Sequence, residues 1–260
     1  MKIQTQSDSE MLCSERSDKK IYRLSSSSAA NYVYGHYKAR NTQISQDREG
    51  KIEDLSDNPL VSYGFDNEKY GVAAFIKKTK VVPNYILADQ SRDRFVVKDW
   101  LNLGDKADAL IDISATPDGV IEKHSLLEVK CPDMGNSCFD KDGKDNIFGV
   151  SKNGFPIQYL CQLAMQQAVM NMVVNENDER LYDIKQSYLV AWSPNRTRIW
   201  KYKFDEEFRN WVFEQLEQYS LCLIDGEKVK PKPDNYKDIL IEQYNKIELK
   251  WDSAGEKHEN

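Results

Sequence analysis

The spacing of hydrophobic residues predicts helices in four parts of the chain. A serine run before Ala29 favours a helix start there, because a serine hydroxyl accepts a hydrogen bond from a free backbone N–H group. Helical spacing of apolar side chains predicts further helices over residues 61–78, over residues 156–174 and from Phe208 to Tyr219.

Short runs of β-branched and aromatic residues, separated by turn residues, predict strands in the middle of the chain. These runs are Val81–Val82 and residues 95–97, 110–113 and 126–130. Residues 187–192 and 197–204 flank a Ser-Pro-Asn-Arg turn and predict a β-hairpin. The order of helices, mixed strands, one helix, two strands and a last helix predicts a mixed α/β domain.

The chain is expected to form one domain with polar ends. No repeat recurs at a fixed period, and no Pro-rich or Gly/Ser-rich linker divides the sequence. We therefore predict a single folded domain over residues 20–251. The ends lack hydrophobic periodicity, which predicts a flexible N-terminus over residues 1–19 and a disordered tail over residues 252–260.

Composition narrows the functional classes. The 260 residues include 36 Lys and Arg against 42 Asp and Glu, a formal net charge of −6. No window approaches the roughly 18–20 apolar residues of a membrane span, and the first residues lack the apolar segment of a signal peptide. We therefore expect no membrane partner and an intracellular protein, in the cytoplasm or nucleus of a host cell.

The cysteines and histidines exclude several kinds of site. Five cysteines without a CxxC pair argue against a disulfide framework and a zinc ribbon. Three histidines leave little for a histidine-based triad or a multi-histidine metal site. Any hydrolytic chemistry is therefore expected to rest on carboxylates.

The densest chemical signal lies in two neighbouring segments, Pro117-Asp118-Gly119 and Leu127-Glu128-Val129-Lys130. The two-residue period of a strand places Glu128 and Lys130 on one face, and a hairpin across residues 122–125 would bring Asp118 near Glu128. Two carboxylates and water are ligands that Mg²⁺ prefers, with Mn²⁺ as an alternative ion. An exposed hairpin with an ordinary Glu/Lys pair is the other interpretation of these residues.

These residue types suit the hydrolysis of a phosphodiester. The negative oxygens of a phosphodiester repel nucleophiles, so a divalent ion has to neutralise them and lower the pKa of the attacking water. Lys130, on the same face as Glu128, would orient that water or stabilise the charge that develops. The residues therefore predict a metal-dependent phosphodiesterase.

In these motifs the chain resembles the PD-(D/E)XK nuclease superfamily, and within it the lambda-exonuclease (YqaJ-type) viral recombination nucleases. The resemblance covers roughly residues 20–219. The stretch Tyr63 to Glu68 is similar to the family's aromatic-Gly-x-x-x-Glu helix, and Tyr159 to Gln162 is similar to its Tyr-x-x-Gln helix. The resemblance implies an α/β fold with a PD-(D/E)XK restriction-endonuclease-like core, in which helices flank a central mixed β-sheet.

The resemblance also assigns site residues. The implied catalytic residues are Asp118, Glu128, Lys130, Glu68 and Gln162. The implied metal ligands are Asp118, Glu128, the backbone carbonyl of Val129 and, as a further ligand, Glu68.

The residues themselves support one of the two helical assignments. Glu68 shares its predicted face with Phe65, Val72 and Phe75, where a carboxylate is costly unless a metal or a donor meets it. A glutamate at the edge of a helix is the alternative for Glu68. Gln162 lies at the border of its apolar stripe, so a glutamine bonded to water is as compatible with the sequence as a functional one.

The serine run suggests an anion site, because hydroxyls and free N–H groups at a helix N-terminus attract anions. In the family a basic residue seven positions before a serine anchors the 5′-phosphate, and the equivalent pair here is Lys20 and Ser27, with Ser25 and Arg23 beside them. The family usually has arginine at the basic position, and Arg16 and Arg23 are nearby substitutes. Helix capping is the alternative role of the serines.

Other parts of the chain depart from the family or leave its DNA contacts open. The second glutamine of the family's Gln-x-Gln pattern is Ala164 here. Two basic clusters would line a groove for DNA, namely Lys77, Lys78 and Lys80 and the run from Arg196 to Lys203. The alternative is that each cluster is an ordinary solvent-exposed face.

The resemblance implies a Mg²⁺-dependent exonuclease that degrades one strand of linear double-stranded DNA in the 5′→3′ direction, releasing 5′-mononucleotides during recombination, repair or viral DNA processing. Its implied partners are double-stranded DNA ends, a homotrimeric ring and a single-strand annealing protein. The alternative enzyme is another PD-(D/E)XK nuclease, namely a structure-specific endonuclease, a RecB-like module or a viral RNA-cutting nuclease. A DNA-binding or assembly protein without activity is disfavoured by the presence of Asp118, Glu128 and Lys130.

Overall fold

The structure of the protein is a computed structural model. The residues it describes are 19–35, 37–50, 58–83, 85–86, 95–103, 108–131, 154–175, 177–203 and 205–253. The predicted flexible segment up to residue 18 and the predicted tail from residue 254 lie outside the described residues. Asp252, at the start of the predicted tail, belongs instead to the last strand.

A three-stranded sheet forms from β1 (Lys20–Ser25), β4 (Ala109–Ala115) and β3 (Phe95–Val97), in the order β1-β4-β3. β1 runs parallel to β4, and β3 runs antiparallel to it. Every residue of β4 is buried, as expected for a central strand that is covered on both faces. The sequence did not predict β1, although the alternation of buried Tyr22 and Leu24 with polar residues is typical of a strand.

A six-stranded sheet has the order β2-β5-β6-β7-β8-β9. The predicted hairpins are confirmed, because β5 pairs antiparallel with β6 and β7 pairs antiparallel with β8, whereas β6 and β7 are parallel. The bounds are β2 (Tyr85–Ile86), β5 (Gly119–Ile121), β6 (Ser125–Lys130), β7 (Gln186–Ser193), β8 (Arg196–Lys203) and β9 (Glu248–Asp252).

All four predicted helices occur in the described residues, and two more, α2 (Tyr37–Glu49) and α6 (Tyr236–Asn245), were not predicted. The other bounds are α1 (Ala29–Val33), which follows a 3-10 turn at Ser26–Ser28, α3 (Pro59–Thr79), α4 (Tyr159–Met172) and α5 (Glu206–Asp225). The largely polar sequence of α2 gave no periodic signal, and Ile44 is its one buried apolar side chain among those the structure describes. None of the described helices combines the length and apolar character that crossing a membrane requires.

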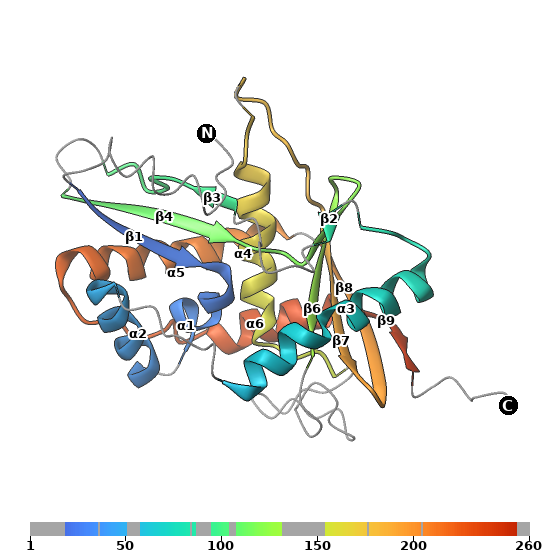
Figure 1. Ribbon diagram of the computed structural model, residues 1–260. Helices are drawn as coiled ribbons and strands as arrows, with labels where there is room; N and C mark the ends of the chain where they lie inside the picture. The colour runs from blue at the N-terminus through green and yellow to red at the C-terminus, as the bar shows by residue number, and fades with distance from the viewer. Residues whose placement is uncertain are drawn as a thin grey trace, which may run out of the picture.

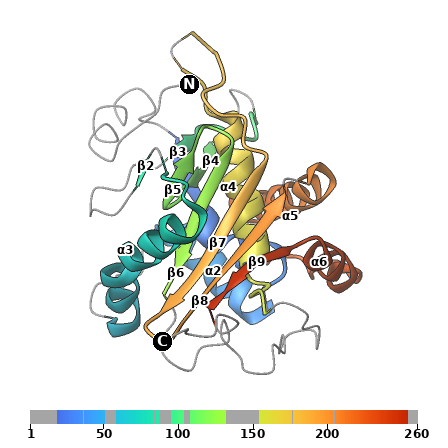
Figure 2. The same ribbon diagram turned by 90° about the vertical axis from the view of Figure 1, so that its right-hand side faces the viewer.

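Helices α3 and α4 lie on opposite faces of β6 and β7. α4 passes between the three-stranded sheet and these strands (Figure 1), and its side chains join a core that includes Leu126 and Leu189. On the other face α3 lies across these strands (Figure 2). Its Val72 and Phe75 side chains belong to one buried cluster with Val129. β6 is therefore covered on both sides, which fits the burial of five of its six residues.

Two local predictions are wrong. Val81 and Val82 form no strand and are 37% and 61% exposed, because Lys80 ends α3 in the left-handed conformation and turns the chain away. Phe65 is 56% exposed instead of sharing a buried face with Val72, since the buried residues of α3 begin only at Gly71.

Candidate active site

Strand β6 directs Glu128 and Lys130 to the face of the sheet that α4 covers. Their register partners on β7 are Leu189 and Ala191, which belong to the core around α4. Val129, between them, points to the opposite face and packs beneath α3. The predicted two-residue alternation is therefore confirmed.

Glu128 is the centre of a hydrogen-bonded cluster. Its side chain is 3% exposed, and the Nε2 atoms of Gln162 and Gln166 donate to Oε1 and Oε2 over 2.6 and 2.7 Å. The Nζ atom of Lys130 lies 2.6 Å from Oε1. A buried carboxylate is costly unless it is paired and hydrogen-bonded, and these three donors meet that requirement. Helix α4 thus brings the amide of Gln162 into contact with Glu128, and its role in the site stays a prediction.

Asp118 comes to the same place through the β5–β6 hairpin. The last ladder pair is Gly119 with Leu127, and Asp118, one residue further, lies opposite Glu128. The Oδ2 atom of Asp118 accepts a hydrogen bond from the backbone N–H of Val129 over 2.7 Å, and Asp118 is 4% exposed. Two buried carboxylates therefore flank the Val129 peptide, as the hairpin prediction requires.

The pKa values of Lys130 and Cys131 beside this cluster are both raised above their ordinary values. Burial acts to lower the pKa of Lys130, but the charges of Glu128 and Asp118 outweigh it and raise that pKa above the ordinary lysine value. Beside these two carboxylates Lys130 is thus a cation at neutral pH, and its Nζ atom donates to Glu128. Burial and the charge of Asp118 raise the pKa of Cys131 to about 12, so its thiol is protonated at neutral pH.

Glu68 belongs to α3, which covers the opposite face of β6 from Glu128. A Cβ atom at Gly71 would lie 2.3 Å from Cγ1 of Val129, so α3 contacts β6 at this point. Glu68 lies one helical turn earlier and is half-buried. Within the described part of the chain, no three His, Cys, Asp or Glu side chains come together in a group that could hold a metal ion, so Glu68 does not complete a three-acid cluster here.

The structure separates the residues of the predicted anion site. Lys20 begins β1 and Ser25 ends it, which puts their Cα atoms about 17 Å apart at the rise of an extended strand. The Nζ atom of Lys20 donates to the backbone oxygen of Arg48. The Nη2 atom of Arg23 lies 3.9 Å from the Oδ2 atom of Asp112. The hydroxyl oxygens of Ser25 and Ser27 lie 2.9 Å from each other.

The serines do not cap the helix in the predicted way. Neither Ser25, at the start of the 3-10 turn, nor Ser28, before α1, makes a side-chain capping bond. The turn at Ser26–Ser28 contacts α4 and β4, so it lies at the end of β4 from which the chain runs on to Asp118.

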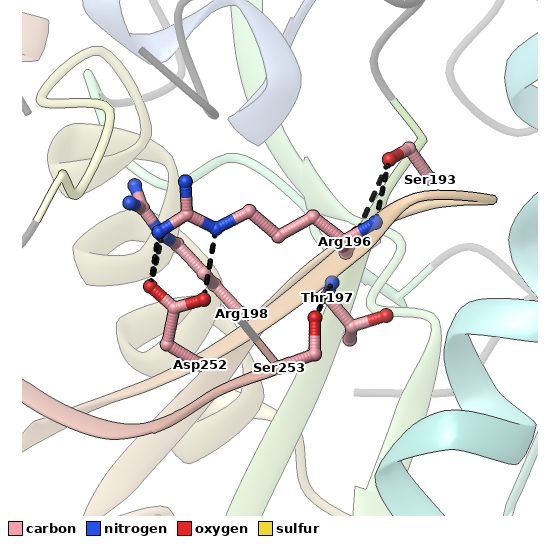
Figure 3. A network of polar contacts seen from close by, with 6 residues as sticks. All are labelled: Ser193, Arg196, Thr197, Arg198, Asp252 and Ser253. Carbon is pink, nitrogen blue, oxygen red and sulfur yellow. Dashed lines mark hydrogen bonds and ion pairs between the residues drawn. The ribbon is translucent and has the colours of Figure 1, made fainter. Parts of the chain in front are cut away.

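The basic run of β8 divides between the two faces of the sheet. By the strand register, Arg196 and Arg198 lie on the same face of the sheet as Glu128 and Lys130. Both arginines donate to the carboxylate of Asp252 on β9 (Figure 3). Lys201 pairs with Tyr188 in the register and lies over its ring on the α3 face. Because successive residues of a strand alternate, the run cannot line one groove.

The residues present fit a divalent cation. Asp118 and Glu128 supply hard carboxylate oxygens, and one lysine offsets only one of their two charges. Mg²⁺ in proteins is typically held by one or two carboxylates, with waters and substrate phosphates completing the coordination, so a third acid is not required. The Oε1 atom of Gln166 is buried and has no hydrogen-bond partner among the described residues, which leaves an acceptor for a donor that is not part of the chain.

Gln166 is the site residue that the sequence analysis missed. It is fully buried and reaches Glu128 from the turn of α4 that follows Gln162. Residues four apart share a helical face, so the spacing of the two glutamines contained this signal. The apolar period of α4 predicts which face is buried, but not which polar side chain on that face contacts a carboxylate.

Comparison with known proteins identifies a family for most of the chain. The model of the family described as YqaJ-like viral recombinase domain matches residues 17–173, which include Asp118, Glu128, Lys130, Gln162 and Gln166. No curated protein matches the sequence.

Solved structures share the fold. The alkaline exonuclease LHK-Exo from Laribacter hongkongensis superposes with a TM-score of 0.52 at 15% identity, over 84% of this chain and 93% of that one. Its complex with dAMP gives a TM-score of 0.51 at 16% identity, with the same coverage. The fold is therefore the PD-(D/E)XK-type α/β fold of alkaline exonucleases, and the family and fold together support a nuclease.

Proposed function

This chain belongs to the YqaJ-like viral recombinase domain family, and on that premise we propose that it is a Mg²⁺-dependent 5′→3′ exonuclease acting on linear double-stranded DNA. The observation that carries the proposal is the buried cluster around Glu128. Lys130 and Gln162 both contact Glu128, and Asp118 accepts a hydrogen bond from the backbone N–H of Val129, the next residue. A purely structural hairpin has no need of two buried carboxylates beside each other, because each costs free energy to bury.

The proposed roles follow from charge and position. Asp118, Glu128 and the carbonyl of Val129 would hold the metal ion, which when bound neutralises the phosphodiester and lowers the pKa of the attacking water. Lys130 carries a positive charge on the same face and would stabilise the negative charge that develops on the phosphate oxygens. Gln162 would hold Glu128 in place from α4. Glu68, half-buried one turn from the α3–β6 contact, is proposed as an additional group that the substrate or metal brings into use.

The substrate and its partners come from the family. The solved relative is named an alkaline exonuclease, and one of its structures contains dAMP. We propose double-stranded DNA ends as the substrate of this chain, with Arg23, Ser25 and Ser27 as contacts of the terminal phosphate. A homotrimer and a single-strand annealing partner are further proposals from the same resemblance.

A comparison of linear, circular and RNA substrates tests whether the chain is an exonuclease on duplex DNA ends. The purified chain would be incubated with Mg²⁺ and linear duplex DNA that carries a 5′-phosphate or a 5′-hydroxyl, beside a closed circle and a single-stranded RNA. We expect release of 5′-mononucleotides from the linear duplex alone, faster with the phosphate, and none in the presence of a chelator. Nicking of the circle would instead identify an endonuclease, and degradation of RNA alone would identify an RNA-cutting enzyme.

A further inference from the structure

Two glutamines of α4, one turn apart, hold the two oxygens of a single carboxylate. Gln162 donates to Oε1 of Glu128 over 2.6 Å, and Gln166 donates to Oε2 over 2.7 Å. Because an ionised carboxylate only accepts, the Nε2 end of each amide has to face it. Lys130 also approaches Oε1, so Gln166 is the donor to the other oxygen.

The second amide donor, Gln166, restricts a rotation of the Glu128 carboxylate that Gln162 alone leaves possible. A carboxylate bonded through one oxygen can still rotate about its last torsion, which is broad for glutamate. Bonding of both oxygens fixes the plane of the carboxylate, and with it the lone pairs that are left for a cation. An amide does this without adding charge, so the net negative charge of the cluster is preserved.

We propose that Gln166 is a positioning residue of the metal site, which sets the orientation in which Glu128 binds a divalent ion. This inference rests on the proposed function, since it concerns the same site. The chain has Ala164 where the second glutamine of the Gln-x-Gln pattern is expected, and Gln166 supplies an amide one turn after Gln162 instead.

The next residue is a matched control. Gln167 lies on the same helix, is 1% exposed and also has a buried Oε1 atom without a partner among the described residues. Its Nε2 atom, however, donates to the hydroxyl of Ser187 over 2.8 Å and not to Glu128. Each Gln→Met replacement removes one buried amide from α4 and keeps a side chain of similar length, so the two variants differ only in which contact is lost.

The experiment compares the full-length chain with Gln166→Met and Gln167→Met. Binding of Mn²⁺ would be measured by the electron paramagnetic resonance signal of the free ion, and the hydrolysis rate on linear duplex DNA would be measured as a function of Mg²⁺ concentration. We expect Gln166→Met to weaken Mn²⁺ binding by about 10- to 100-fold, the usual effect of removing a group that orients a metal ligand, and to raise the half-saturating Mg²⁺ concentration. Gln167→Met should leave both quantities unchanged.

The outcomes separate this inference from the proposed function. Equal Mn²⁺ affinity in the two variants would overturn the role of Gln166 while leaving the nuclease intact. A wild-type chain that neither binds Mn²⁺ nor cleaves DNA would overturn both. If Gln166→Met does not fold, Gln166→Asn decides the question, because its shorter amide withdraws from Glu128 and keeps a polar group at the position; it too should weaken Mn²⁺ binding, and unaltered binding would refute the role.

Discussion

The Nε2 atom of Gln162 lies 2.6 Å from the Oε1 atom of Glu128, although 34 residues separate them in the chain. This bond connects the first turn of α4 to the middle of β6 within the buried interior. Any change that displaces α4 would therefore also displace the carboxylate on which the proposed chemistry depends.

Removal of the charge of Asp118 should slow cleavage strongly without disturbing the hairpin. In Asp118→Asn an oxygen acceptor for the N–H of Val129 is retained, but a negative ligand for the metal ion is lost. We expect hydrolysis to fall on the order of 10²- to 10³-fold, since metal-ion stabilisation contributes several kcal/mol and about 1.4 kcal/mol corresponds to a factor of ten. Single-turnover rates and DNA-binding titrations check this, and full activity in the variant would exclude Asp118 from the site.

Substitution of Lys130 should separate catalysis from metal binding. Lys130→Met leaves Glu128 buried without its cation, so we expect slower hydrolysis and a lower melting temperature. A divalent ion then supplies the missing positive charge, and Mg²⁺ should raise the melting temperature of the variant more than that of the wild type. Thermal melts with and without Mg²⁺ measure the difference; an equal rise in both proteins would mean that the ion does not bind beside Glu128.

Two glycines of α3 should respond to alanine in opposite ways. At Gly71 the new Cβ would come 2.3 Å from Cγ1 of Val129, so we expect a loss of about 1–3 kcal/mol from overpacking. At Gly64 nothing lies within 4 Å, and alanine should add about 0.5–1 kcal/mol because it lowers the entropy of the unfolded chain. Denaturant unfolding of Gly71→Ala and Gly64→Ala measures both. A second substitution, Val129→Ala, should relieve part of the loss at Gly71, and its failure to do so would argue against the close contact between α3 and β6.

The cap of α5 predicts a pH dependence of stability. Burial acts to raise the pKa of Asp205, but Lys246 and the N–H of Phe208 outweigh it and hold that pKa below its ordinary value of 3.8. A carboxyl group with a lowered pKa stabilises the fold above pH 3.8, and this contribution is lost as the pH falls through its folded-state value.

The variant Asp205→Asn keeps an acceptor for Phe208 and loses only the charge. We expect it to be less stable than the wild type by about 0.5–1 kcal/mol at pH 7, the range for an ion pair that is partly exposed. Urea melts from pH 7 down to pH 3 should bring the two curves together at the acid end. A gap that widens on acidification would contradict the lowered pKa of Asp205.

The centre of the site could be predicted from the sequence because its geometry is local. Two hairpin strands joined by a short turn fix the register of Asp118 against Glu128, and the strand period places Lys130 beside Glu128. The contribution of α4 is different, because it depends on how a distant helix packs. A helical period predicts a buried stripe, but not that Gln166 within it is directed at a carboxylate.

Other differences between prediction and structure also depend on features that spacing along the chain does not contain. That spacing pairs Lys20 with Ser27 in the predicted anion site, which stays a prediction, whereas the extended strand β1 places Lys20 at the opposite end from Ser25. The exposure of Phe65 depends on where α3 extends past the sheet, which helical spacing alone does not contain. Arg196 and Lys201 count together in a sum of charges, but strand alternation directs them to opposite faces.

The central claim is that Glu128 and its neighbours hydrolyse phosphodiesters with a divalent metal ion. The most direct test follows the release of acid-soluble nucleotides from linear duplex DNA over a range of Mg²⁺ concentrations, for the wild type and for Glu128→Gln with its melting temperature recorded. The account predicts a saturable dependence on Mg²⁺ in the wild type and no release by a folded Glu128→Gln at any concentration. Release by the folded variant at the wild-type rate, or release by the wild type that persists in excess chelator, would contradict it.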